Sequence, residues 1–214
     1  LGGAQPRFYV PDRVEEGYGL NRDALDRLRA EGVDLVVTVD CGVASVREAE
    51  HARSIGLELI LTDHHEFADR LPPADVLVHP RLPGAAYPFA ELCGAGVAFK
   101  VAWELARRFS GARRTTDAFQ KFLLDATSLA AVGTVCDVVP LYDENRVLVH
   151  HGLTSLKASP PLGLARLMSA AGLDKKPRLD ASDVGFSIGP RLNACGRLGT
   201  ARLGVELLTT RDAA

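Results

Sequence analysis

The sequence predicts an α/β fold in which a parallel β-sheet flanked by helices precedes a mainly helical half. In the first part, short apolar runs alternate with helical segments of about a dozen residues, a pattern typical of right-handed βαβ units. From Gly94 onward, apolar residues recur at helical spacing and turn residues separate the segments. We therefore expect a sheet region at residues 1–92 and a helical region at residues 93–214.

Local signals place the individual elements. Asn21 is a candidate N-cap and Gly32 a stop signal for one helix, and Ser45 and Gly56 bracket the next helix in the same way. The run "DLVVTVD" at 34–40 lacks polar alternation, as expected of a strand covered on both faces. The predicted strands are 7–11, 34–40, 57–63 and 75–80, and the predicted helices are 21–32, 45–56, 96–109, 116–133, 145–158 and 162–172.

The composition is that of an ordinary globular domain, with 47% hydrophobic and 24% charged residues among 214. A net charge of −2 indicates no general basic field for nucleic acid, although a local patch could still bind phosphate. No apolar stretch has the length of a membrane span, so we expect no membrane association. The four cysteines form no CxxC pair, which argues against a zinc cluster or disulfide framework and favours reduced thiols in the cytoplasm. Because the chain does not begin with Met, we expect it to be part of a longer protein.

Ionisable residues follow two of the predicted strands directly. Asp40 ends the strand at 34–40, and Asp63, His64 and His65 end the next one. Active groups in parallel sheets gather at these carboxyl ends, so both sets are expected to face one crevice. Neighbouring side chains on an extended chain alternate faces, so either one of the two imidazoles is idle or they do different jobs around one centre. The alternatives are a turn-forming or capping Asp and a hydrogen-bonded core His.

A third carboxylate, Asp137, lies between apolar pairs in "GTVCDVVPL" and is expected to be buried. A buried lone carboxylate is costly unless it is paired or binds a metal, so a ligand role is favoured. The alternative is a capping Asp at the end of a helix before Pro140.

The stretch "GFSIGPRLNACGRLGTARLG" at 185–204 combines glycines with Arg191, Asn193 and Arg197. Glycines let a ligand approach backbone N–H groups, and guanidinium matches phosphate oxygens in a bidentate manner. Near the start, "VPDRVEEGYGLN" offers Arg13 in a loop. The alternatives are a Gly-rich connection with structural arginines and a charged turn.

Several motifs together resemble a known family. The stretches "VDCG", "TDHHE", "GTVCDVVPL…NR" and "PRLNACGR" occur in the order found in DHH phosphoesterases. "VPDRVEEGYGLN" and "SIGPRLNACGRLG" resemble more specifically the RecJ-type exonucleases, which degrade single-stranded DNA from a 5′ end. The similarity spans nearly all of the chain and implies a metal-binding sheet region at 1–92. The helical part at 93–214 would then carry Asp137 and the phosphate-binding "PRLNACGR" segment.

The resemblance also implies roles for individual residues. Asp40 would bridge two divalent ions, Mn²⁺ or Mg²⁺, and His64 and Asp137 would complete one coordination sphere. His65 would contact the scissile phosphate or help the leaving group, and Asp63 would orient a histidine. Two ions about 3.5–4 Å apart can activate water and neutralise charge on the attacking and leaving oxygens. The residues expected to hold phosphate or DNA are Arg191, Asn193, Arg197 and Arg13.

The chain departs from the family pattern in two places. It lacks the Asp-rich first motif, expected just before Leu1, and the C-terminal substrate-binding domain. We therefore expect the 214-residue chain alone to hydrolyse nothing efficiently, and its parent to be a metal-dependent 5′→3′ single-stranded DNA exonuclease of recombination and repair. Single-strand-binding protein or a helicase is a candidate partner. The alternatives are a DHH phosphoesterase that cuts short oligonucleotides or cyclic dinucleotides, and a catalytically dead scaffold in replication.

Overall fold

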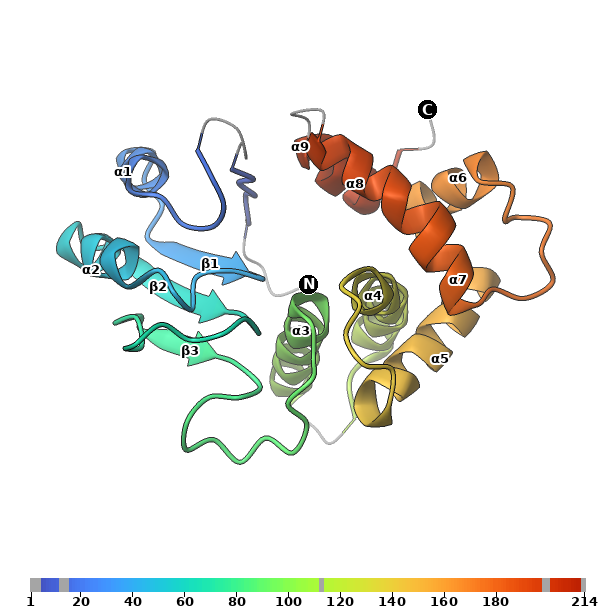
Figure 1. Cartoon of the computed structure of the whole chain (residues 1–214), viewed down its shortest axis with the longest axis horizontal. Coiled ribbons are helices and arrows are strands. Elements are labelled where there is room, and N and C mark those ends of the chain that lie inside the picture. The colour runs from blue at the N-terminus through green and yellow to red at the C-terminus, as the bar shows by residue number, and fades with distance from the viewer. Residues whose placement is uncertain (1–4, 12–15, 112–113, 198–200, 213–214) are drawn as a thin grey trace.

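A three-stranded parallel sheet carries the first part of the chain, and its strands are β1 (Leu35–Val39), β2 (Glu58–Thr62) and β3 (Val76–Val78), in that spatial order (Figure 1). The register pairs Val39 with Thr62 and Thr62 with Val78, so the three carboxyl ends meet at one edge. The predicted parallel sheet is confirmed. This computed structural model describes residues 5–11, 16–111, 114–197 and 201–212.

Two helices, α1 (Arg22–Ala30) and α2 (Val46–Ser54), cover one face of this sheet. Asn21 caps α1 as predicted, since its side chain accepts a hydrogen bond from the backbone N–H of Ala24 at 2.7 Å. Ser45 precedes α2 as predicted but forms no capping bond through its side chain. The buried residues between helices and sheet are Leu25, Ala49, Ala52, Leu57, Leu59 and Leu61.

Two predictions about the strands are wrong. Residues 7–11 form no strand, because their side chains bind α1 and its flanks instead: Arg7 pairs with Glu31, and Arg27 lies over the ring of Tyr9. β1 is not covered on both faces, since Leu35, Val37 and Val39 are 44–55% exposed. That face of β1 is half exposed, whereas the side chains of β2 are largely buried as expected.

The second half is helical, as predicted, and begins with two helices that cross closely. Its elements are α3 (Gly94–Ser110), α4 (Asp117–Cys136), α5 (Asp143–Ala158), α6 (Leu162–Ala170), α7 (Ala181–Asp183), the π-helix η1 (Val184–Ile188), α8 (Gly189–Arg197) and α9 (Ala201–Thr209). A Cβ atom at Gly133 of α4 would collide with the Cβ of Ala95 of α3. Small residues at this crossing therefore let α3 and α4 approach closely, and Figure 1 shows the pair between the sheet and the other helices.

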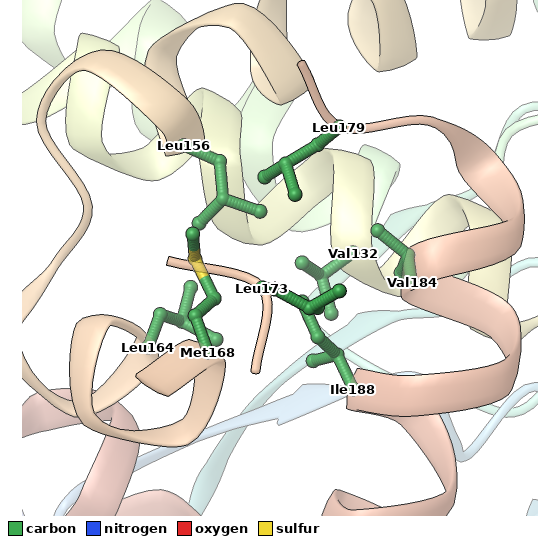
Figure 2. Packing of buried hydrophobic residues seen from close by; sticks show 8 residues of the cluster. All are labelled: Val132, Leu156, Leu164, Met168, Leu173, Leu179, Val184 and Ile188. Carbon is green, nitrogen blue, oxygen red and sulfur yellow. The ribbon is translucent and has the colours of Figure 1, made fainter. Parts of the chain in front are cut away.

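The core of the helical half lies between α4, α5, α6 and η1 and consists of aliphatic side chains (Figure 2). The described part of 185–204 belongs to this half as helix, so the alternative of a glycine-rich connection does not hold for it. Gly189 serves packing there, because a Cβ at this position would lie 2.7 Å from the sulfur of Cys136 at the end of α4. The core residues are Val132, Leu156, Leu164, Met168, Leu173, Leu179, Val184 and Ile188.

The remaining sequence-level expectations concern cysteines and membranes. All four cysteines are free thiols, in line with the absence of a disulfide framework. Among the described helices, none combines the length and the apolar character that crossing a membrane requires.

The packing of α4 against α5 gives a testable prediction. A Cβ at Gly152 of α5 would collide with Ala131 and lie 2.5 Å from the carbonyl oxygen of Thr127. We expect Gly152→Ala to lower the free energy of unfolding by about 1–3 kcal/mol, because overpacking outweighs the gain in helix propensity. Gly196 in α8 has open space around it. Gly196→Ala is therefore the control and should leave the urea midpoint equal or higher; equal losses in both variants would contradict the packing argument.

Candidate metal centre

The backbone itself brings the strand-end residues to one edge. The N–H of Asp40 donates to the carbonyl of Thr62 at 2.9 Å, and that of Asp63 donates to the carbonyl of Val78 at 3.1 Å. The hydrogen-bond ladder of the sheet thus extends one residue beyond the ends of β1 and β2. Asp40 then adopts a left-handed conformation with φ 66°, and the chain leaves the sheet through Gly42, whose φ is 109°. A side chain at Gly42 would also meet Leu61 at 2.8 Å, so this exit requires glycine.

Asp63 is a buried hydrogen-bond acceptor at the centre of this edge. It is 1% exposed, and its carboxylate accepts bonds from the backbone N–H groups of Val43 (2.9 Å), His64 (2.8 Å) and His65 (3.2 Å). Nδ1 of His65 lies 2.7 Å from the same carboxylate. Burial alone would raise the pKa of Asp63, but the bonds from Val43, His65 and His64 outweigh burial and lower it. Asp63 is therefore an ionised anchor for the backbone of both histidines.

The two imidazoles have different partners. Nε2 of His64 lies 3.1 Å from Oδ1 of Asp40 and 3.5 Å from Oδ2 of Asp137, whereas His65 is bonded to Asp63. Their rings are 4.4 Å apart and inclined by 50°. The two imidazoles therefore contact different carboxylates, and the separate tasks expected of them stay a prediction.

The contact between Asp40 and His64 has the character of a cation site. Oδ1 of Asp40 and Nε2 of His64 are shielded from solvent, yet neither has a well-aligned hydrogen-bond partner among the described residues. Ligand atoms of Asp40, His64 and His65 also lie within 4.8 Å of one another. Buried polar atoms without partners cost about 1–3 kcal/mol each, and a divalent ion would satisfy them. Carboxylate oxygen and imidazole nitrogen are donors that suit Mn²⁺, so these residues fit the ion that the sequence implies.

Asp137 joins this group from the helical half. It is the C-cap residue of α4, and its neighbour Val138 has φ 60°, which turns the chain away immediately after it. The expectation of a buried Asp137 is wrong: its side chain is 35% exposed and Val138 is 87% exposed, because α4 ends at the rim. Partial burial raises the pKa of Asp137, and the nearby His64 opposes that rise. Its carboxylate faces His64, as a ligand role requires.

The start of α3 also meets this group, which the sequence analysis missed. A Cβ atom at Gly94 would collide with the carboxylate of Asp40, so only glycine lets α3 begin there. The preceding Cys93 is the N-cap of α3, and its sulfur lies 3.4 Å from the hydroxyl of Thr134 in the last turn of α4. The glycine pair in "CGAG" before a helical run was the available signal.

Asn145 holds the two loops that flank the centre. It is fully buried, and its amide donates to the carbonyl of Glu91 at 2.6 Å and to that of Pro140 at 3.0 Å. One loop leads into α3 and the other follows Asp137. The task of Asn145 could not be predicted from its motif, because carbonyl positions are not visible in a sequence.

Tyr18 is a further residue at the rim that the sequence analysis did not single out. Its hydroxyl donates to the backbone carbonyl of Asp40 at 2.6 Å, and its ring lies edge-on to His65 at 6.2 Å. The ring thereby limits the space on the outer side of His65.

Two of the four residues expected to hold phosphate or DNA, Arg191 and Asn193, have described side chains. Arg13 lies outside the described residues, and Arg197 ends α8 without a description of its side chain. Arg191 and Asn193 are exposed on α8, and Nη1 of Arg191 donates to the carbonyl of Ser187 at 2.7 Å. Neither forms a hydrogen bond or ion pair with Asp40, His64 or Asp137, although α8 begins beside Cys136, the residue before Asp137.

The geometry agrees with a comparison of the sequence. A family model described as the DHH family, N-terminal domain, matches residues 2–134. The chain belongs to the DHH family. It is 44% identical over 209 residues to the single-stranded-DNA-specific exonuclease RecJ of Bacillus subtilis, covering 98% of this chain and 25% of that protein. It is 41% identical to RecJ of Escherichia coli, covering 97% of this chain and 36% of that protein.

Solved structures of DHH proteins show the same fold. A crystal structure of exonuclease RecJ bound to manganese superimposes with a TM-score of 0.81 at 39% identity, over 96% of this chain and 49% of that one. RecJ from Thermus thermophilus in complex with Mn²⁺ gives a TM-score of 0.75 at 37% identity, over 90% of this chain and 27% of that one. This chain therefore spans between about a quarter and a half of the length of these relatives.

The contact between His64 and Asp40 predicts the titration of the metal-free protein. The carboxylate of Asp40 raises the pKa of His64 above its ordinary value, against burial, and the charge of Asp137 adds to the rise. The protonated pair therefore stabilises the fold at low pH, and this contribution is lost as the pH rises through the raised pKa. NMR titration of the imidazole should show a pKa above 6.5 that falls in Asp40→Asn. Asp26 contacts His51 and not His64. Asp26→Asn is therefore the control and should leave the His64 titration unchanged.

Proposed function

We propose that this chain is the catalytic core of a metal-dependent single-stranded DNA exonuclease that hydrolyses phosphodiesters from a 5′ end. One observation carries the proposal: Nε2 of His64, at one strand end, lies 3.1 Å from a carboxylate oxygen of Asp40, at the neighbouring strand end, and 3.5 Å from one of Asp137, at a helix end. The similarity to RecJ proteins supports the choice of substrate, because those relatives are named for single-stranded DNA.

Each residue of the centre has a proposed task. Asp40, His64 and Asp137 would hold Mn²⁺ or Mg²⁺, and bound ions supply an activated water and neutralise charge on the phosphate. Asp63 holds His65 through Nδ1, which leaves Nε2 for an oxygen of the scissile phosphate or of the leaving group. The exposed position of His65 at the rim is consistent with direct contact to substrate.

The wider setting follows from the same proposal. We infer that the full-length protein acts on DNA in the cytoplasm during recombination and repair. Single-strand-binding protein or a helicase would supply single strands as partners. Because this chain has a near-neutral charge, we infer that other parts of the full-length protein supply most of the affinity for DNA. A DHH phosphoesterase for short oligonucleotides or cyclic dinucleotides is the second candidate, and the exposed side chain of His65 is compatible with it. A catalytically dead scaffold has no need for the ionisable cluster of Asp40, His64 and Asp137.

Hydrolysis by the full-length protein tests the proposal. With Mn²⁺, we expect 5′-phosphorylated single strands to be degraded far faster than duplexes or dinucleotides, and EDTA to stop the reaction. Asp137→Asn should lower kcat/KM at least ~100-fold, a loss of about 2.7 kcal/mol of transition-state stabilisation, because a proposed cation ligand is neutralised. Asp117→Asn, in the first turn of the same helix, is the matched control and should stay within about threefold. The proposed function would be overturned if the protein cleaved dinucleotides in preference to single strands, or if Asp137→Asn kept full activity.

The position of Arg191 on α8 predicts a specific effect on the substrate end. A guanidinium–phosphate bond contributes about 1.5–3 kcal/mol, so Arg191→Ala should reduce the preference for 5′-phosphate over 5′-hydroxyl strands roughly 10-fold or more. Arg191→Lys should recover part of the preference, since it keeps the charge but loses the bidentate geometry. Arg178→Ala, at another exposed arginine of the helical half, should change nothing. An unchanged preference in Arg191→Ala would exclude this residue from the phosphate site.

A further inference from the structure

The backbone of His64 and His65 has left the sheet, so its polar groups need partners from elsewhere. Asp63 takes both N–H groups, as described above. Both carbonyl groups are taken by side chains that follow β3: Nη2 of Arg81 donates to the carbonyl of His64 at 2.8 Å, and Nε2 of His79 lies 2.9 Å from the carbonyl of His65. All four main-chain polar groups of this dipeptide are therefore bound by side chains.

His79 is built into its place. It is 5% exposed, and its ring lies 4.3 Å from that of Phe67. Its Nδ1 accepts a hydrogen bond from the backbone N–H of Arg81 at 3.0 Å. Since Nδ1 is an acceptor, the proton of the neutral ring is on Nε2, which then donates to the carbonyl of His65. Burial lowers the pKa of His79, in agreement with a neutral ring.

Arg81 completes the arrangement from the outer side. Its Nη1 donates to the carboxylate of Glu66 at 2.7 Å while Nη2 holds the carbonyl of His64. One guanidinium thus ties together the residues on either side of His65. Because the backbone N–H of Arg81 also bonds His79, the two side chains after β3 act as one unit, which we name the β3 clasp (His79 and Arg81).

We propose that the β3 clasp is a positioning device that sets the direction in which His64 and His65 present their imidazoles to the cation and the substrate. This inference rests on the proposed function of the centre and assigns a task to two residues that touch neither cation nor substrate. A carbonyl that lost its donor would let the peptide plane rotate, and the Cβ of the neighbouring histidine would move with it. Catalytic groups displaced by about 1 Å can lose activity 100-fold, so loss of the clasp is expected to misalign both histidines.

The chemistry of histidine offers a matched pair of variants. The amide nitrogen of Gln reaches about as far as Nε2, so His79→Gln can still donate to the carbonyl of His65. The amide of Asn reaches only as far as Nδ1, so His79→Asn keeps an acceptor for the N–H of Arg81 but loses the bond to His65. Both variants place a neutral amide in the same buried site, and Gln gives up the acceptor for the N–H of Arg81 that Asn keeps. A larger loss in His79→Asn than in His79→Gln therefore reports the bond to His65.

The test measures Mn²⁺ affinity of the full-length protein by EPR, together with kcat, KM and thermal unfolding. We expect His79→Asn and Arg81→Ala to weaken Mn²⁺ binding about 10–100-fold, as is typical when a group that orients a metal ligand is lost. His79→Gln should stay within about threefold. Met168→Ala, in the helical core, should lower the unfolding temperature without changing Mn²⁺ affinity.

Three results would overturn the inference. One is equal Mn²⁺ affinity in His79→Asn and the wild type. Another is an equal loss in His79→Asn and His79→Gln, and the third is a loss in Met168→Ala as large as in His79→Asn. Failure of the proposed function is recognised separately: the wild-type protein would then bind Mn²⁺ but not degrade single-stranded DNA, and the affinity series would still decide the role of the clasp.

Discussion

The buried carboxylate of Asp63 is the interaction on which the geometry of the centre depends. It accepts bonds from Val43, in the chain that leaves β1, and from both histidines that follow β2. Two irregular segments from neighbouring strands are thus fixed to one anion. Isolated burial of a carboxylate is unfavourable, and here several N–H donors offset it. A protonated Asp63 would lose acceptors for these donors, so the order of the rim and the ionisation of this residue are linked.

The centre combines residues of the sheet region and of the helical half. Glycines at the contacts between these two parts let them approach closely enough. Gly94 lets α3 start against Asp40, and Gly133 lets α4 approach Ala95 of the same helix α3. Asn145 then joins the loop before α3 to the loop after α4. Asp137 can therefore reach His64 although it belongs to the helical half. Stability and site geometry share these contacts, because α4, which ends at the proposed ligand Asp137, also contributes Val132 to the helical core.

Much of this arrangement follows from the sequence because it depends on short-range patterns. The order of strands and helices is visible in the apolar periodicity, and the meeting of Asp40 with His64 follows from the geometry of parallel strand ends. The helix in the described part of 185–204 was not predictable from local propensity, since its glycines disfavour helix. The packing of Gly189 against Cys136 of α4 accounts for one of them. The exposure of Asp137 depends on where α4 ends in space. The tasks of His79 and Arg81 depend on the location of two carbonyl groups, about which residue identities say nothing.

The backbone conformation of Val138 lowers the stability of the fold and turns the chain directly after Asp137. A β-branched residue in the left-handed region costs roughly 1–2 kcal/mol relative to glycine, and this one is also almost fully exposed. Selection for thermostability alone would therefore favour glycine or asparagine there. Such a replacement would remove the strain at φ of Val138 but would also loosen the backbone beside the proposed ligand Asp137. Stability and catalytic activity would therefore place opposite demands on this residue. If valine is retained at this site during evolution, selection for the position of Asp137 outweighs selection for stability.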